Sequence, residues 1–556
     1  MKTIKSILTL LSAVILISAC NKEFLDTVPT ASIAEENVFS SSENSMLAIN
    51  GIHRMMHEGN ASGTTTGNYG QGGYPTFCLH LAWMSDDVVW TYDNVMYKFS
   101  AQWTHHRDLT HSYNDMNYYW KFFYRVINNA NKVIEVYENE NLPMTETYSY
   151  LALGEAYAYR GFALYQLVQT WASRYVPGQN NTQLGVIIRA EPSADNRPRS
   201  SVEECYTQII SDLNDAFDCL ENNRVAKVNK SHFDKYVVKG LLARVYLTMG
   251  RWQDAADAAQ YVISNSGAKL QDNTHTTTIN RHSDATNTEW LWALIATADG
   301  TQGGVLRSWH NFISNNNASY NRNTPRAILN LLWESIPQTD VRKGLWIKDP
   351  YASGITLFLP SNSASRNAPW ISQKWVIDDS STQNAYRDVS YMRLPEIMLI
   401  AAEGYAKSGQ EDKAKDILYT LVRHRDPAYT RSTSTGNNLT EEIIWQRRVE
   451  LWAENGLRWL DLKRLDLPVD RGPKPRDGYN QGGTANGWST SATRAPWNNP
   501  NVPVLDPLAS NYNMYGEQMP GERARYIERP SRNINWQWLI PIDEIDSNPL
   551  CEQNPE

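Results

Sequence analysis

The sequence predicts a mainly α-helical fold in which helix pairs stack into a repeat scaffold that carries a large irregular lobe. Three observations predict it. A pattern of small, aromatic, glycine and small residues occurs twice, and long amphipathic stretches surround both copies. Between the copies, more than a hundred residues lack helical periodicity. A chain of 556 residues is long enough to bury the core of such a scaffold.

The repeated pattern has the spacing of a tetratricopeptide helix-turn-helix. Its two copies share the offsets 0, 3, 7 and 12, at Ala243, Tyr246, Gly250 and Ala255 and again at Ala402, Tyr405, Gly409 and Ala414. Small residues let antiparallel helices approach closely, the tyrosine fills the space between them, and glycine permits the turn. We therefore expect helical repeats over about 118–265 and 391–465.

Further helices follow from apolar periodicity and capping signals. We expect them over Ser45–Met56, Tyr118–Glu138 and Thr145–Trp171, with the clear repeat pair at His232–Gly250 and Trp252–Ser264. Ser201 and Glu204 form a capping box that begins another helix. The stretch 289–296 (EWLWALIA) is typical of a strand.

The composition limits the function. A net charge of −8 and a pI near 5.8 argue against nucleic acid, which requires a basic face. The 20 tryptophans and 30 tyrosines exceed what a repeat core needs, so some of these rings are expected at a binding surface. The alternative is that large loops pack on them.

The N-terminus predicts the location of the protein. Lys2 and Lys5 precede an apolar stretch over 7–17 that is too short to span a bilayer. The following Ile17-Ser18-Ala19-Cys20 resembles a bacterial lipobox, which implies cleavage before Cys20 and lipidation of that residue. We expect a signal peptide at 1–19, a lipidated tether at 20–42 and one domain over 43–556. An ordinary signal peptide with an incidental cysteine is the alternative.

The other cysteines are Cys78, Cys205, Cys219 and Cys551. Cys205 and Cys219 lie about 21 Å apart along one predicted helix, too far for a disulfide. Their spacing shows no metal-ligand motif. We expect mostly buried thiols and leave open a disulfide of Cys78 or Cys551.

Two irregular regions are candidates for a binding site. Neither helix nor strand periodicity fits Tyr74–His106 for long, but Trp90, Tyr92 and Asn94 alternate and would project on one side of an extended segment. Aromatic rings beside amide and carboxylate groups suit a sugar, whose apolar face stacks while its hydroxyls bond. A buried aromatic cluster is the alternative. The second region is the irregular lobe over about 269–387.

Charged residues raise the alternative of an enzyme. The stretch Thr440–Arg464 is expected to be a helix capped by Thr440, with a ladder of acidic and basic residues that we interpret as a structural network. For a glycoside hydrolase, the candidate acids and bases are Asp86, Asp87, Asp93, Asp108, His105 and His106. HExxH, GxSxG and Rossmann motifs are absent, so we predict no enzymatic activity. The acidic stretch nearest to a calcium-binding loop, Asp378-Asp379, lacks the glycine and the final glutamate of an EF-hand.

Four segments are distinctive, together with FLDTVPT after Cys20: 241–259 (LLARVYLTMGRWQDAADAA), 394–409 (LPEIMLIAAEGYAKSG), 447–464 (RRVELWAENGLRWLDLKR) and 540–556 (IPIDEIDSNPLCEQNPE). Through these segments the chain resembles the SusD/RagB family of outer-membrane nutrient-binding lipoproteins of Bacteroidetes. The resemblance covers the mature chain in the family's order. Cys551 and Glu556 depart from the usual ending.

The resemblance implies four helix pairs and irregular loops that form the ligand surface. It implies a surface-exposed lipoprotein that binds oligosaccharide or polysaccharide and delivers it to a SusC-type TonB-dependent transporter, with no cofactor. No metal ligand is predicted from the sequence, and the binding of calcium is left open. By order along the chain, it assigns ligand contact to Trp90, Tyr92 and Asn94, and to Trp309 or Tyr320 in the lobe. Gly73-Tyr74 stands where some relatives use arginine, so Tyr74 is included and ligand preference is expected to differ. A scaffold that binds peptide or another nutrient for such a transporter is the alternative.

Overall fold

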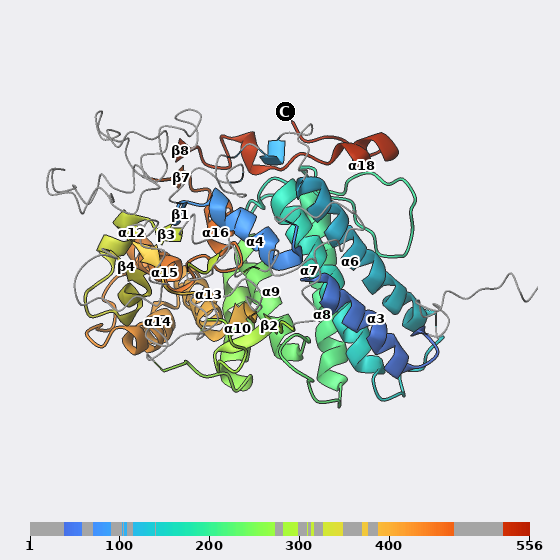
Figure 1. Cartoon of the computed structure of the whole chain (residues 1–556), viewed down its shortest axis with the longest axis horizontal. Coiled ribbons are helices and arrows are strands. Elements are labelled where there is room, and N and C mark those ends of the chain that lie inside the picture. Colours follow the sequence, from blue (N-terminus) through green and yellow to red (C-terminus); the bar gives the residue numbers. More distant parts are fainter. Residues whose placement is uncertain are drawn as a thin grey trace, which may run out of the picture.

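The computed structural model describes residues 38–57, 71–90, 100, 103, 105–107, 115–139, 141–272, 282–297, 309, 313–315, 326–348, 370–375, 387–471 and 526–555, with backbone only at 89, 90 and 105. Helices dominate these residues, and short strands cluster to one side (Figure 1). The predicted signal peptide, Cys20 and most of the predicted tether lie outside the described residues.

The scaffold is a series of helices in which each packs on the next. Within the described ranges, the eight helices of this series are α6 (Asp115–Glu138), α7 (Ser149–Trp171), α8 (Val202–Asn222), α9 (Lys235–Met249), α10 (Trp252–Asn265), α13 (Leu394–Lys407), α14 (Glu411–Arg425) and α15 (Gly436–Glu450). Helix α3 (Ser42–Met55) lies against α6 and α7, on the right in Figure 1. The predicted mainly helical, tetratricopeptide-like fold is confirmed.

The two predicted repeat pairs are α9/α10 and α13/α14, and each pair turns at its glycine. Gly250 has a φ of 73° and Gly409 a φ of 82°, a left-handed backbone that favours glycine. Helices α10 and α13 approach closely, since a Cβ on Gly404 would lie 2.6 Å from the carbonyl oxygen of Trp252. These glycines and small residues therefore set the helix spacing.

Other predicted elements are also present. The capping box of α8 forms as expected, because the Ser201 hydroxyl accepts from the Glu204 N–H and the Glu204 carboxylate accepts from the Ser201 N–H. The predicted strand is β2 (Trp290–Leu294), which pairs antiparallel with β6 (Val389–Arg393).

Helix α4 (Gly73–Met84) corrects the reading of 74–106 as irregular from its start. All twelve of its residues are buried. A helix covered on every side shows no polar face, so apolar periodicity could not reveal it. Helix α4 packs against α16 (Leu457–Arg464) and leads into β1 (Val88–Trp90).

The lobe contains a four-stranded antiparallel sheet with the order β1-β3-β5-β4. Its other strands are β3 (Arg326–Ile328), β4 (Trp346–Ile347) and β5 (Ile371–Ser372). The short helix α12 (Asn330–Ser335) and the 3₁₀ helix η6 (Val341–Leu345) follow β3. Since β1 precedes the scaffold helices in the chain, this sheet joins the early aromatic segment to the lobe.

The predicted continuous helix over 440–464 is wrong. Helix α15 begins at Gly436, so Thr440 lies inside it, and α16 is separate. The chain between them contains Ala453, Asn455 and Gly456 with φ values of 59°, 49° and 65°. These left-handed residues end one helix and redirect the next.

Two members of the charged ladder, Glu450 and Glu454, belong to a buried ionic network. The others form separate ion pairs: Arg447 with Asp461, and Arg448 and Arg458 with Asp87 and Asp86. Arg393 donates to Glu289, Glu450 and Glu454, and Arg425 donates to Glu289 and Glu450. The network contains four cations and four anions: Arg342, Lys374, Arg393 and Arg425, with Glu289, Asp340, Glu450 and Glu454. It fastens η6 and the end of β5 to α14 and α15.

The C-terminal segment runs along the top of the molecule in Figure 1 and ends near α7. It contains β8 (Tyr526–Ile527), which pairs with β7 (Val469–Asp470), then η10 (Ile534–Trp536) and α18 (Ile542–Ser547). The buried Lys463 ammonium donates to the carbonyl oxygens of Gln169, Ala172 and Trp536 at 2.6, 2.8 and 2.9 Å. Asn554 donates to the carbonyl oxygens of Trp171 and Trp538.

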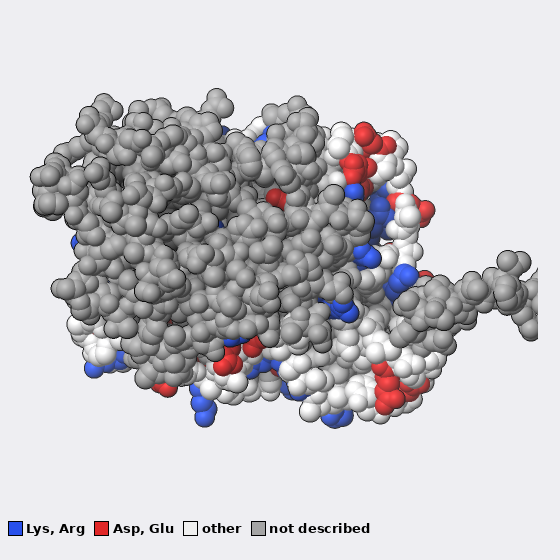
Figure 2. All heavy atoms as spheres, in the orientation of Figure 1, with Lys and Arg blue, Asp and Glu red and all other residues white. Residues whose placement is uncertain are grey.

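The four described cysteines are free thiols, three of them buried and Cys219 half-buried, so the disulfide left open does not form in this structure. Among the helices that the structure describes, none has both the length and the apolar character to cross a bilayer. Acidic and basic side chains are scattered over the described part of the face in Figure 2, and acidic groups gather over α18.

Candidate functional site

A pocket of about 480 Å³ opens beside the lobe, a volume within the range of small-molecule sites. Helices α12, α15 and α16 and the chain leading into β7 form its walls. Its lining combines charged, aromatic and apolar groups, among them Asp86, Arg448, Arg458, Trp445, Leu331 and Leu467. Leu331 and Leu467 are 40% and 36% exposed, so apolar surface faces solvent at this pocket.

Asp86 and Asp87 are held by two arginines. Arg458 donates to both carboxylate oxygens of Asp86 at 2.7 and 2.8 Å, and Arg448 donates to Asp87 at 2.6 Å. Burial alone would raise the pKa of Asp86, but Arg458 and Arg448 outweigh it and lower that pKa to about 2. The ionised, clamped Asp86 carboxylate is therefore a poor general acid. Burial raises the pKa of Asp87 despite Arg448. The bonds to the two arginines anchor the chain before β1.

Strand β1 carries the first residue of the predicted sugar-stacking set. Trp90 is its last residue and pairs with Arg326 of β3, which confirms the predicted extended backbone at this point. In the described sheet, β1 is an edge strand. The side chain of Trp90, and Tyr92, Asn94, Asp93 and Asp108, lie outside the described residues.

Tyr74 is a core residue, which corrects the expectation that it faces a ligand. Its ring is 2% exposed and meets the rings of Phe162 and Tyr391 edge to face, each with a centroid distance of 5.0 Å. The reason is its position near the start of the fully buried helix α4. A sugar has no access to either face of this ring.

Trp309 is also covered in this structure. It is 5% exposed and meets Trp375 edge to face at 4.5 Å. Its ring faces protein, so we do not carry Trp309 into the proposed ligand surface. Tyr320 lies outside the described residues.

His106, a candidate base, has a structural partner. Its Nε2 donates to the carbonyl oxygen of Asn535 at 2.7 Å, and burial lowers its pKa to about 3. The ring is therefore neutral, and its hydrogen bond to Asn535 holds the C-terminal segment beside η2 (His105–Arg107). The described part of His105 does not include its side chain.

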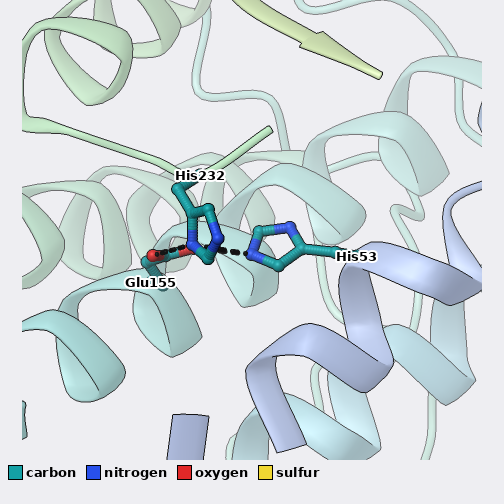
Figure 3. A group of neighbouring side chains, drawn as sticks. All are labelled: His53, Glu155 and His232. Atoms are coloured by element: carbon teal, nitrogen blue, oxygen red, sulfur yellow. Dashed lines mark hydrogen bonds and ion pairs between the residues drawn. The ribbon is translucent and has the colours of Figure 1, made fainter. Parts of the chain in front are cut away.

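Sequence reasoning missed a cluster of His53, Glu155 and His232. These residues come from α3, from α7 and from the chain just before α9, and their side chains converge (Figure 3). Burial lowers the pKa of His53 against the opposing effect of Glu155. The separations of 102 and 77 residues match no local motif, so only the fold reveals the cluster.

Comparison with known proteins identifies the family. Two family models match: one described as starch-binding, associating with the outer membrane, over residues 81–247, and the SusD family over residues 358–556. A SusD-like protein of Bacteroides ovatus is 25% identical over 292 residues, which cover 48% of this chain and 45% of that relative. The chain thus aligns with less than half the length of this relative. SusD-like protein P2 of Formosa agariphila is 24% identical over 385 residues, 63% of this chain and 71% of the relative.

Solved structures share the fold. A SusD superfamily protein of Bacteroides thetaiotaomicron has a TM-score of 0.66 at 22% identity, and the superposition covers 93% of this chain and 100% of that protein's chain. One from Bacteroides vulgatus has a TM-score of 0.69 at 18% identity and covers 93% and 99%. With both family models, the repeat scaffold and the curated relatives in agreement, the chain belongs to the SusD/RagB family.

Proposed function

We propose that this protein is a surface-exposed outer-membrane lipoprotein that binds oligosaccharide or polysaccharide and delivers it to a SusC-type TonB-dependent transporter. The observation that carries the proposal is the pocket beside edge strand β1 in a chain of the starch-binding, outer-membrane-associated family. Cys20 is the proposed lipid anchor. The proposed chemistry is binding, without a cofactor.

The proposed ligand surface extends from this pocket along the segment that begins at Trp90. Asp86 lines the pocket and Trp90 follows four residues later, so the chain between them spans at most about 14 Å. Trp90, Tyr92 and Asn94 supply stacking rings and an amide, which match the apolar face and the hydroxyls of a pyranose. Clamping of Asp86 by Arg458 fixes the start of this segment.

The test is affinity electrophoresis of the mature protein, without residues 1–20, in gels that contain plant, host or microbial polysaccharides. We expect retardation by a selective set of polysaccharides, lost when Trp90 and Tyr92 are both replaced by alanine. Tyr419→Ala is the matched control, because that ring is 37% exposed on α14. Thermal unfolding of the double variant should stay close to that of the wild type.

Three results would contradict the proposal. Retardation by no polysaccharide, combined with binding of a peptide pool, would favour the peptide-binding alternative. A large loss of thermal stability in the double variant would show that these rings are core residues. Release of reducing ends from a glycan by the purified protein would instead establish a hydrolase.

A further inference from the structure

A group of nitrogen and oxygen ligands lies away from the proposed ligand surface. His53 Nε2 lies 3.0 Å from Glu155 Oε2, His232 Nδ1 lies 2.8 Å from Glu155 Oε1, and the two ring nitrogens are 3.1 Å apart (Figure 3). Glu155 is fully buried, and His53 keeps 11% of its side chain exposed. His232 keeps 8% of its side chain exposed, so solvent reaches the cluster past the two histidine rings and not past Glu155.

Hydrogen bonds alone leave this cluster unsatisfied. A bond between the two ring nitrogens needs one proton between them, with one nitrogen accepting. Donation from both rings to Glu155 needs a proton on each nitrogen, which places two N–H groups against each other. No tautomer of two neutral rings meets all three contacts, and in the described part of the chain Glu155 Oε2 has only its 3.0 Å ion-pair contact with His53 Nε2.

A bound cation resolves the conflict, because all three atoms then direct lone pairs to one centre. Ligands at 2.0–2.1 Å from a tetrahedral Zn²⁺ are about 3.4 Å apart. The two ring nitrogens, 3.1 Å apart, need to separate by only a few tenths of an ångström. One ligand atom from each of the three residues lies within 4.8 Å of the other two, so the side chains can reach a common centre with small movements.

The surroundings of His53 suit metal ligation. Its other ring nitrogen, Nδ1, hydrogen-bonds the Tyr159 hydroxyl. When Nδ1–H donates to that hydroxyl, the lone pair on Nε2 is left for the metal, and the ring orientation is fixed. Tyr159 is buried and follows Glu155 by four residues on α7, so both come from one rigid element.

We propose that His53, Glu155 and His232 form a binding site for a divalent transition metal, with Zn²⁺ as the ion. Two imidazoles and one carboxylate are a donor set that Zn²⁺ accepts, with water in the fourth position. Calcium and magnesium prefer oxygen ligands and are excluded by the two nitrogens. The ion joins α3 to α7 and to the chain before α9, so it fastens the first described helix to the scaffold.

The test uses the mature protein with any histidine tag removed, since a tag binds the same metals. After treatment with a chelator and exchange into clean buffer, Zn²⁺ is titrated by calorimetry and Co²⁺ by visible absorption. We expect one ion per chain with a Kd of about 1 µM or tighter. Bound Co²⁺ should show the strong visible bands of a four- or five-coordinate site, and Zn²⁺ should raise the Tm, whereas Ca²⁺ should not.

Variants assign the ion to these residues. His53→Gln and Glu155→Gln should each weaken Zn²⁺ binding at least about tenfold. His424→Gln is the matched control, because that ring hydrogen-bonds the Gln271 carbonyl oxygen instead. Circular dichroism in chelator checks that each variant folds, and the wild-type Co²⁺ spectrum tests the site even when a variant does not fold.

Absence of Zn²⁺ binding by the wild type would overturn the proposal, and so would tight binding that His53→Gln and Glu155→Gln leave unchanged. A Co²⁺ spectrum of a six-coordinate, water-like ion would do the same. These measurements need no glycan, so they test the metal site independently of the proposed function.

Discussion

Replacement of Arg393 by methionine should destabilise the protein by about 4 kcal/mol. The Arg393 guanidinium makes five hydrogen bonds, four to carboxylates and one to a backbone carbonyl, and its side chain is 2% exposed. The described network holds four cations and four anions, so the variant leaves one buried negative charge uncompensated. Removal of one partner from a buried ion pair typically costs 3–5 kcal/mol.

The assay is urea unfolding followed by tryptophan fluorescence. The slope for a chain of this size is about 3 kcal/mol/M or more, so the midpoint should fall by roughly 1 M. Arg431→Met is the matched control, because Arg431 pairs with Asp412 and Asp416 at the surface, where its own side chain is 42% exposed. The control should shift the midpoint far less than Arg393→Met does, because solvent screens an exposed ion pair.

The pH dependence gives a second check. In the wild type, burial would raise the pKa of Glu289, but Arg425 and Arg393 outweigh it and lower that pKa. Without Arg393, the uncompensated charge favours a protonated carboxyl in the folded variant, whose stability is then lost as pH rises. The difference from the wild type should therefore be larger at pH 8 than at pH 5. A midpoint shift no larger than that of Arg431→Met would refute this reasoning.

Two further predictions concern acid titration and the lipid anchor. Burial raises the pKa of Asp115 from 3.8 to about 7. The protonated carboxyl therefore contributes its full stabilisation below pH 4, and this contribution is lost as pH rises to 7. Asp115→Asn keeps an oxygen that accepts from Gln71. In urea unfolding, the free energy of unfolding of this variant should rise relative to that of the wild type by up to about 4 kcal/mol between pH 4 and pH 8. Equal pH profiles for the two proteins would contradict this prediction. Cys20→Ala should move the protein from the membrane fraction to the soluble fraction of fractionated cells, and unchanged membrane association would contradict the proposed anchor.

The sequence was most informative where local signals and packing agree. Gly250 and Gly409 are both required by their turns, so the two repeat pairs were predictable. The capping box at Ser201 depends only on residues three apart. Helix α4 was missed because a fully buried helix has no polar face to show periodicity. Ala453 has a left-handed backbone, although alanine is not a residue type that favours it. The sequence therefore did not predict the break before α16.

Contacts between residues far apart in the chain could not be predicted from local sequence patterns. The charges of Glu450 and Glu454 were visible, but Arg342 and Lys374, which complete the network, come from the lobe. Likewise, no spacing links His53 to His232, which are 179 residues apart. Tyr74 illustrates the opposite error, since its place in the order of the family's segments, where some relatives use arginine, suggested a ligand contact, and the residue proved to be core.

The contacts of the C-terminal segment determine when the fold can close during synthesis. Asn554 supplies the donor for the carbonyl oxygen of Trp171, 383 residues earlier, and Trp536 completes the carbonyl cage around Lys463. A chain made from its N-terminus therefore has only the weak 3.5 Å contact of Arg199 for the Trp171 carbonyl at the end of α7 until the C-terminal segment is present. Nascent chains that lack this segment remain open at that end, where chaperones and proteases have access.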